Sequence, residues 1–196
     1  MATVTEICNI ALSRIGVSRF IDNIDESSVE AMTCKVHYNN VISSIFRKDY
    51  FPSLQVMKPL ALIDEAPNER WAYAYQYPAD CARFRGFVVG TNYAAGRLNA
   101  QFERGIHNGA DVIFTDLDSA VAAYQVLPDT LDETLGSMVA WRLAAEIALP
   151  LAVEQSRRSD AMQMFQIEKS QCMATELNES YHEPVDSEFI NVRGLD

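Results

Sequence analysis

Four segments of the chain carry apolar residues at the spacing of an α-helix. The first begins at a capping box formed by Thr3 and Glu6. The second follows the acidic and serine-rich residues 25–28, which suit the positive N-terminus of a helix. The third covers residues 130–151 and is apolar on nearly all sides, which predicts a central, buried helix. The fourth covers residues 154–180 and is amphipathic.

Between residues 52 and 128 the helical spacing gives way to short alternating runs separated by turn residues. The most regular run is an aromatic ladder in which small or polar residues separate Trp71, Tyr73, Tyr75 and Tyr77. A period of two places the four rings on one face of a strand, and Pro78 ends that strand. The ladder is more typical of a sheet that packs on helices than of a substrate wall.

A hairpin is predicted further along this middle region. Residues 100–106 and 111–115 are strand-like, and the turn between them contains an Asn-Gly pair. His107 and Asn108 therefore lie at the tip of the predicted hairpin.

Together these patterns predict a mostly α fold of the α+β type. We expect a helical bundle of about four helices, a small β-rich insertion and an extended C-terminal tail. The bundle comprises residues 1–51 plus 129–180, the insertion residues 52–128, and the tail residues 181–196.

The tail has no helical period and is acidic. From Glu176 to Asp196, six acidic residues and one basic residue give a local net charge of −5. Two interpretations stay open: a disordered acidic tail, or an arm that orders on a partner. The second interpretation rests on four apolar side chains with no obvious place to be buried, Tyr181, Phe189, Ile190 and Val192.

The net charge and the cysteine pattern of the chain argue against some classes of function. The chain has 196 residues, 48% of them hydrophobic and 22% charged, and a formal net charge of −11. An acidic chain is not expected to grip nucleic acid through a basic face, although an acidic lining would let a polyanion slide past. No signal peptide or membrane-spanning segment is expected. The four scattered cysteines form no CxxC pair and are expected to be buried free thiols.

Candidate catalytic chemistry is weak. The Cys34-x-x-His37 pair lacks a second pair at metal spacing, and no glycine-rich phosphate loop is present. Acidic residues that could act in pairs are so abundant that they carry little information, among them Asp64, Glu65, Asp111, Asp116 and Asp118. We therefore expect no catalytic residue, no cofactor and no metal.

The order of three segments resembles the head–tail adaptor proteins of tailed bacteriophages, a family that includes tail accessory factors and tail tubular proteins. The segments are NIALSRIG at 9–16 with IDESSVEA at 24–31 and a helix containing Tyr38, then WAYAYQYPADC at 71–81, then the alanine-rich helix 138–151 after a strand containing Tyr124. The second segment is similar to the family's aromatic strand ending in Leu-Pro-x-Asp-Cys. The family's Trp-x-Phe-Ala element is replaced by Tyr50-Phe51-Pro52-Ser53.

The resemblance implies a non-enzymatic structural protein of the virion, made in the host cytoplasm and located at the head–tail junction. It implies a ring, usually of twelve copies, that binds the portal protein above and a distal tail or nozzle protein below. Double-stranded DNA would pass through this ring without specific binding, and no membrane is involved. The candidate interface residues are Tyr181, Phe189, Ile190, Val192, His107 and Asn108.

Two alternatives from other classes stay open. One is a phage-associated peptidoglycan hydrolase that uses paired carboxylates, and the other is a generic helical interaction protein.

Overall fold

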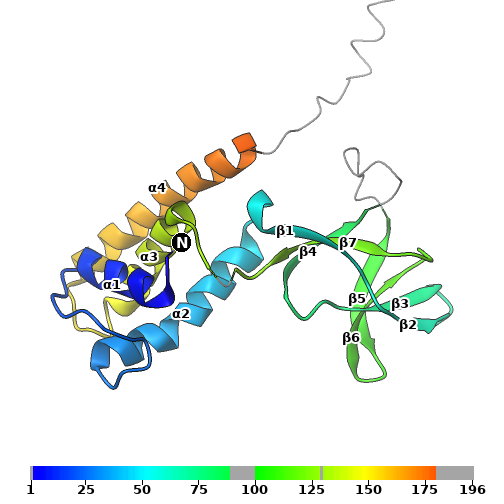
Figure 1. Ribbon diagram of the computed structural model, residues 1–196, viewed down its shortest axis with the longest axis horizontal. Coiled ribbons are helices and arrows are strands. Elements are labelled where there is room, and N and C mark those ends of the chain that lie inside the picture. Colours follow the sequence, from blue (N-terminus) through cyan, green and yellow to red (C-terminus); the bar gives the residue numbers. More distant parts are fainter. Residues whose placement is uncertain (1, 89–99, 129, 180–196) are drawn as a thin grey trace, which may run out of the picture.

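The computed structural model describes residues 2–88, 100–128 and 130–179. Within them the chain is elongated, with helices at one end and strands at the other (Figure 1). The four α-helices are α1 (Val4–Arg14), α2 (Val29–Lys48), α3 (Glu133–Ile147) and α4 (Gln155–Glu179), with a short 3-10 helix η1 (Pro52–Leu54). The seven strands are β1 (Gln55–Pro59), β2 (Leu62–Glu65), β3 (Tyr73–Gln76), β4 (Cys81–Phe87), β5 (Phe102–His107), β6 (Ala110–Thr115) and β7 (Val121–Val126).

Local capping signals explain where the helices begin. The predicted capping box is present at α1, with the Thr3 hydroxyl accepting from Glu6 N and the Glu6 carboxylate accepting from Thr3 N. At α2 and α3 the caps are single hydrogen bonds: a side-chain oxygen of Ser28 accepts from Ala31 N, and one of Asp132 accepts from Leu135 N. The predicted helices are therefore confirmed, with α2 ending at Lys48.

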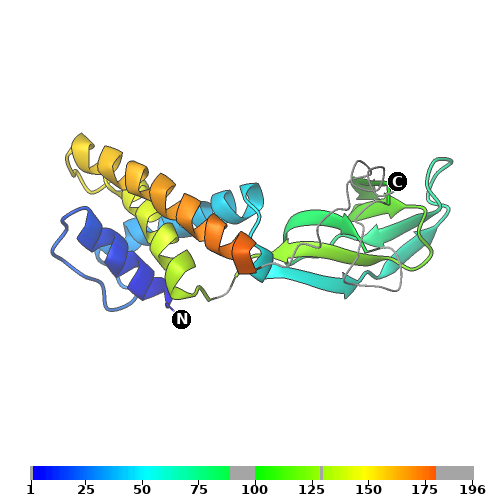
Figure 2. The ribbon, with the colours of Figure 1, turned by 90° about the horizontal axis from the view of Figure 1, so that it is seen from above.

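Helix α3 is the centre of the helical end, as its apolar sequence predicted. It packs against α1, α2 and α4, and α4 crosses its outer side (Figure 2). Arg14 on α1 donates to the carbonyl and the hydroxyl of Ser137 and lies 4.1 Å from the Trp141 ring centroid. These contacts fix α1 on α3 through one partly buried guanidinium.

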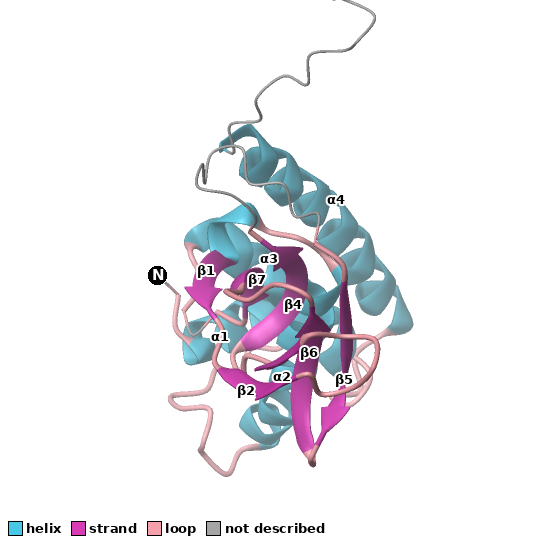
Figure 3. Ribbon diagram, turned by 90° about the vertical axis from the view of Figure 1, so that its right-hand side faces the viewer, coloured by secondary structure: helices cyan, strands magenta, loops and turns pink. Residues whose placement is uncertain are grey.

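The strands form two antiparallel sheets, one in the order β1-β7-β4 and the other in the order β2-β3-β6-β5. Strands β5 and β6 form the predicted hairpin, with His107 paired to Ala110. Asn108 and Gly109 both have positive φ, as a two-residue hairpin turn of the primed type requires. Viewed from the strand end, both sheets lie in front of the helices (Figure 3).

The predicted fold class is wrong. Within the described residues, four α-helices and seven strands in two sheets make an α+β fold with substantial sheet, instead of a mainly helical bundle with a small insertion. The physical reason lies in β1 and β2, which are short edge strands with mostly exposed side chains. Such strands lack the alternation of apolar and polar residues that marks a half-buried strand. The sequence pattern therefore predicted fewer strands than the structure has. The predicted domain boundaries stay a prediction, and the tail, residues 181–196, lies outside the described residues.

The aromatic ladder also packs differently from the expectation. Tyr73, Tyr75 and Tyr77 pack against residues of the other sheet instead of the helices, and Trp71 Nε1 donates to Glu103 on β5 of its own sheet. Tyr75 is 2% exposed and belongs to a cluster of strand and loop residues with Cys81, Phe87, Ile113, Ala120, Ala122 and Tyr124, against which Tyr73 and Tyr77 pack. The Tyr75 hydroxyl donates to Leu117 O at 2.8 Å, so its polar end is satisfied. The two sheets thus have a hydrophobic core of their own.

The junction between the two ends is organised by one buried polar side chain. Gln125 on β7 is fully buried, and its amide nitrogen donates to Phe46 O and Asp49 O. Its amide oxygen accepts from Phe51 N at 2.7 Å. The Phe46 and Phe51 rings pack edge to face beside it, 5.2 Å apart. Gln125 therefore binds the chain where it leaves α2 and turns into the sheet.

Helix α4 reaches the same junction by two polar contacts. Lys169 Nζ lies 2.6 Å from Asp49 Oδ2, and both side chains are mostly buried. Glu176 accepts from Ser53 N at 2.9 Å and from Ser53 Oγ at 2.7 Å. The far end of α4 is thus held against η1.

We expect Gln125→Leu to lower the free energy of unfolding by about 2–4 kcal/mol, because it leaves backbone donors and acceptors of the junction without partners. Urea denaturation followed by circular dichroism measures the change. The matched control is Gln76→Leu on β3, whose side chain is exposed and whose effect should stay within about 0.5 kcal/mol. Equal effects of the two substitutions would contradict the role assigned to Gln125.

The four cysteines are buried and free, as expected: Cys8, Cys34, Cys81 and Cys172. Burial raises the pKa of the Cys172 thiol to about 12 and also raises that of Cys81. Thiolate is the reactive form. Ellman's reagent at neutral pH should therefore react with the native chain only slowly, and with all four thiols after unfolding. Rapid reaction of a native thiol would contradict the burial.

Candidate interaction surfaces

Only two of the six candidate interface residues predicted from the sequence, His107 and Asn108, lie in the part of the chain that the structure describes. Tyr181, Phe189, Ile190 and Val192 lie outside the described residues, and their interface role stays a prediction. His107 ends β5, and Asn108 lies in the turn between β5 and β6. This turn forms the lower end of the four-stranded sheet in Figure 1.

His107 binds the hairpin tip to β2, the strand at the opposite edge of the same sheet. Its Nε2 lies 2.8 Å from Asp64 Oδ2 on β2 and 3.1 Å from Asn108 Nδ2. One ring nitrogen either donates to the carboxylate or accepts from the amide, so the two contacts compete. The ring also packs edge to face on Phe114. Within the chain His107 therefore has a positioning role, and its predicted contact with a partner is untested.

An exposed apolar surface that the sequence reasoning missed lies on α2. Val29, Met32 and Val36 are 59%, 52% and 66% exposed, and their spacing places them on one face of the helix. We call these three residues the α2 stripe. The opposite face of α2 is buried and includes Ala31 and Cys34. The signal was present in the sequence as a second set of apolar residues at helical spacing.

The four-stranded sheet offers two further surfaces at its edges. Strands β2 and β5 are outermost, so each has one row of backbone groups without a partner strand among the described residues. Leu62 on β2 is 45% exposed, and Ile106 on β5 is 74% exposed. Open edges with apolar side chains are suited to contacts with another chain.

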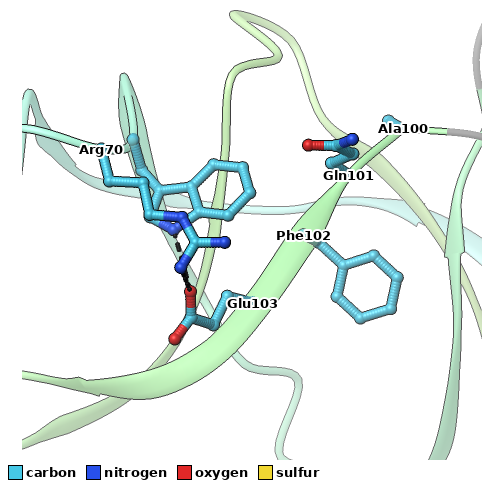
Figure 4. A pocket seen from close by; sticks show the side chains of 6 residues that line it. Arg70, Ala100, Gln101, Phe102 and Glu103 are labelled. Carbon is cyan, nitrogen blue, oxygen red and sulfur yellow. Dashed lines mark hydrogen bonds and ion pairs between the residues drawn. The ribbon is translucent and has the colours of Figure 1, made fainter.

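One shallow hollow lies beside the aromatic ladder (Figure 4). It is lined by Arg70, Trp71, Ala100, Gln101, Phe102 and Glu103. Glu103 Oε2 accepts from Trp71 Nε1 at 3.2 Å and pairs with Arg70 Nη1 at 3.0 Å. The Glu103 carboxylate is therefore bound by two donors that line the same hollow. These bonds hold the walls of the hollow together and leave that oxygen occupied.

Several carboxylates that a hydrolase would use have partners within the fold. Asp64 binds His107, Asp111 lies 3.4 Å from Arg104 Nη2, and Asp116 accepts from Ala72 N. Across residues 2–88, 100–128 and 130–179, no three His, Cys, Asp or Glu side chains gather as a metal site would require.

No helix within the described ranges is both long enough and apolar enough to cross a membrane. No protein-family model matches this chain, and no curated protein matches it significantly.

Proposed function

We propose that the protein is a structural component of a bacteriophage virion, a head–tail adaptor that forms a ring beneath the portal protein. The ring extends the DNA channel and provides the attachment platform for the tail. The observation that carries the proposal is the α2 stripe, three large apolar side chains that the described part of the fold leaves more than half exposed. Exposed apolar patches of this kind are typical of surfaces that bind another chain.

A closed ring needs two different surfaces on each subunit, because neighbours meet head to tail around the rotation axis. The α2 stripe lies at the helical end, and the edge strands β2 and β5 lie at the sheet end. In the proposed ring the helices form the wall, and the sheets face a neighbouring subunit or the distal tail protein. The twelve-copy stoichiometry is an expectation from the resemblance.

The charge of the chain is compatible with a channel. With a formal net charge of −11, a ring of many copies repels DNA phosphates on average. Double-stranded DNA would therefore pass without being held. The portal above and a tail or nozzle protein below are the proposed partners, and the head–tail junction of the virion is the proposed location.

The test uses electron microscopy of the purified protein mixed with the portal protein of the same phage. The parent chain should form rings on the portal. The double variant Met32→Lys, Val36→Lys should stay folded, because both side chains are exposed, and should fail to form rings. The matched control, Gln163→Lys with Gln166→Lys at exposed positions of α4, adds the same charge away from the stripe and should assemble like the parent.

Two outcomes would overturn the proposal. One is a parent chain that does not assemble on the portal, and the other is a double variant that assembles as well as the control. Zymography on peptidoglycan with the same samples tests the hydrolase alternative, which predicts clearing that is lost when one carboxylate is substituted.

A further inference from the structure

Four cations gather where α2 meets β4. Arg47 and Lys48 lie in the last turn of α2, and Arg83 and Arg85 lie two residues apart on β4. None of the four forms an ion pair with any carboxylate of residues 2–88, 100–128 or 130–179. We call these residues the junction cations. In a chain of net charge −11, an uncompensated basic cluster calls for an explanation.

Packing brings the two arginines of β4 to the end of α2, where Arg47 and Lys48 lie. Arg83 Nη1 donates to Lys48 O at the end of α2, and the Arg85 guanidinium lies 3.8 Å from the Tyr50 ring centroid. Arg85 Nε is buried, and it has no hydrogen-bond partner among the described residues. Neighbouring like charges repel one another, so an anion at this surface would stabilise it.

The described end of α4, which precedes an anionic segment in the sequence, lies near this surface. Glu176 near the end of α4 binds Ser53, and Arg85 packs on Tyr50. Tyr50 and Ser53 are three residues apart, so their Cα atoms are at most about 11 Å apart.

Beyond α4 the sequence continues with Glu183, Asp186, Glu188 and Asp196 against a single cation, Arg193. An extended chain covers about 3.3–3.6 Å per residue, so these carboxylates can reach the junction cations from the end of α4.

We infer that the acidic segment 183–196 docks on the junction cations of its own chain. The occupant is the same chain and not a second copy, because a tether that starts beside the surface raises the local concentration of the segment far above that of free protein. The occupant is not DNA, because the net charge of −11 repels phosphate at long range. The inference rests on charge and tether geometry and does not depend on the proposed ring.

The experiment measures where the segment lies in the full chain. A spin label is attached at Ser187→Cys, and the buried native thiols are protected from the labelling reagent. In low salt the label should cause loss of the backbone amide NMR signals of Arg47, Lys48 and Arg83. The signals should return in high salt, because exposed charges are then screened.

Charge variants decide whether the junction cations are responsible. Arg47→Glu with Lys48→Glu should abolish the signal loss, and both side chains are exposed, so the fold should tolerate the change. The matched control is Arg157→Glu with Arg158→Glu at the other end of α4, which should leave the signal loss unchanged.

A rescue variant guards against an indirect effect of the substitutions. Changing Glu183 and Glu188 to Lys in the Arg47→Glu, Lys48→Glu chain should restore the signal loss, since the charges are exchanged. The inference is overturned if the signal loss survives the Arg47→Glu, Lys48→Glu change. It is also overturned if the signal loss grows with protein concentration, which would indicate binding to a second copy. A third contrary outcome is an equal loss of amide signals over the whole surface of the protein.

Discussion

The buried amide of Gln125 is the contact on which the arrangement of helices and sheets depends. The chain leaves α2 at Lys48 and enters β1 at Gln55, and between them only the short 3-10 helix η1 is regular. Gln125, on the central strand of the three-stranded sheet, accepts from Phe51 N and donates to Phe46 O and Asp49 O. A buried side chain that satisfies three backbone groups specifies one geometry, because any other leaves those groups unpaired.

The other features of the junction follow from this geometry. It places Asp49 beside Lys169 and Ser53 beside Glu176, so that α4 is held at the base of the sheets. It also brings β4 against the end of α2 and gathers the junction cations there. The α2 stripe and the sheet edges are then held at a fixed separation, as the proposed ring would require.

The helical part of the fold was predictable because its signals are local. The capping box at Thr3, the capping residue Ser28 and the Asn108-Gly109 turn each depend on a few neighbouring residues. The extent of the sheet was not predictable, because β1 and β2 are exposed edges without alternation. Gln125 carries no sequence signal, since a polar residue in an alternating strand normally faces solvent. The α2 stripe was predictable from its helical spacing, but the prediction of this helix rested on the apolar residues of its buried face alone.

The most direct test of this account measures the distance between the helical end and the sheet end in solution. Spin labels at Asn40 on α2 and at Ser119 in the loop before β7, both exposed, report that distance by pulsed electron paramagnetic resonance. The account predicts one narrow distance distribution in the parent chain, which broadens in Gln125→Leu. A broad distribution in the parent chain, or an unchanged narrow one in Gln125→Leu, would contradict it.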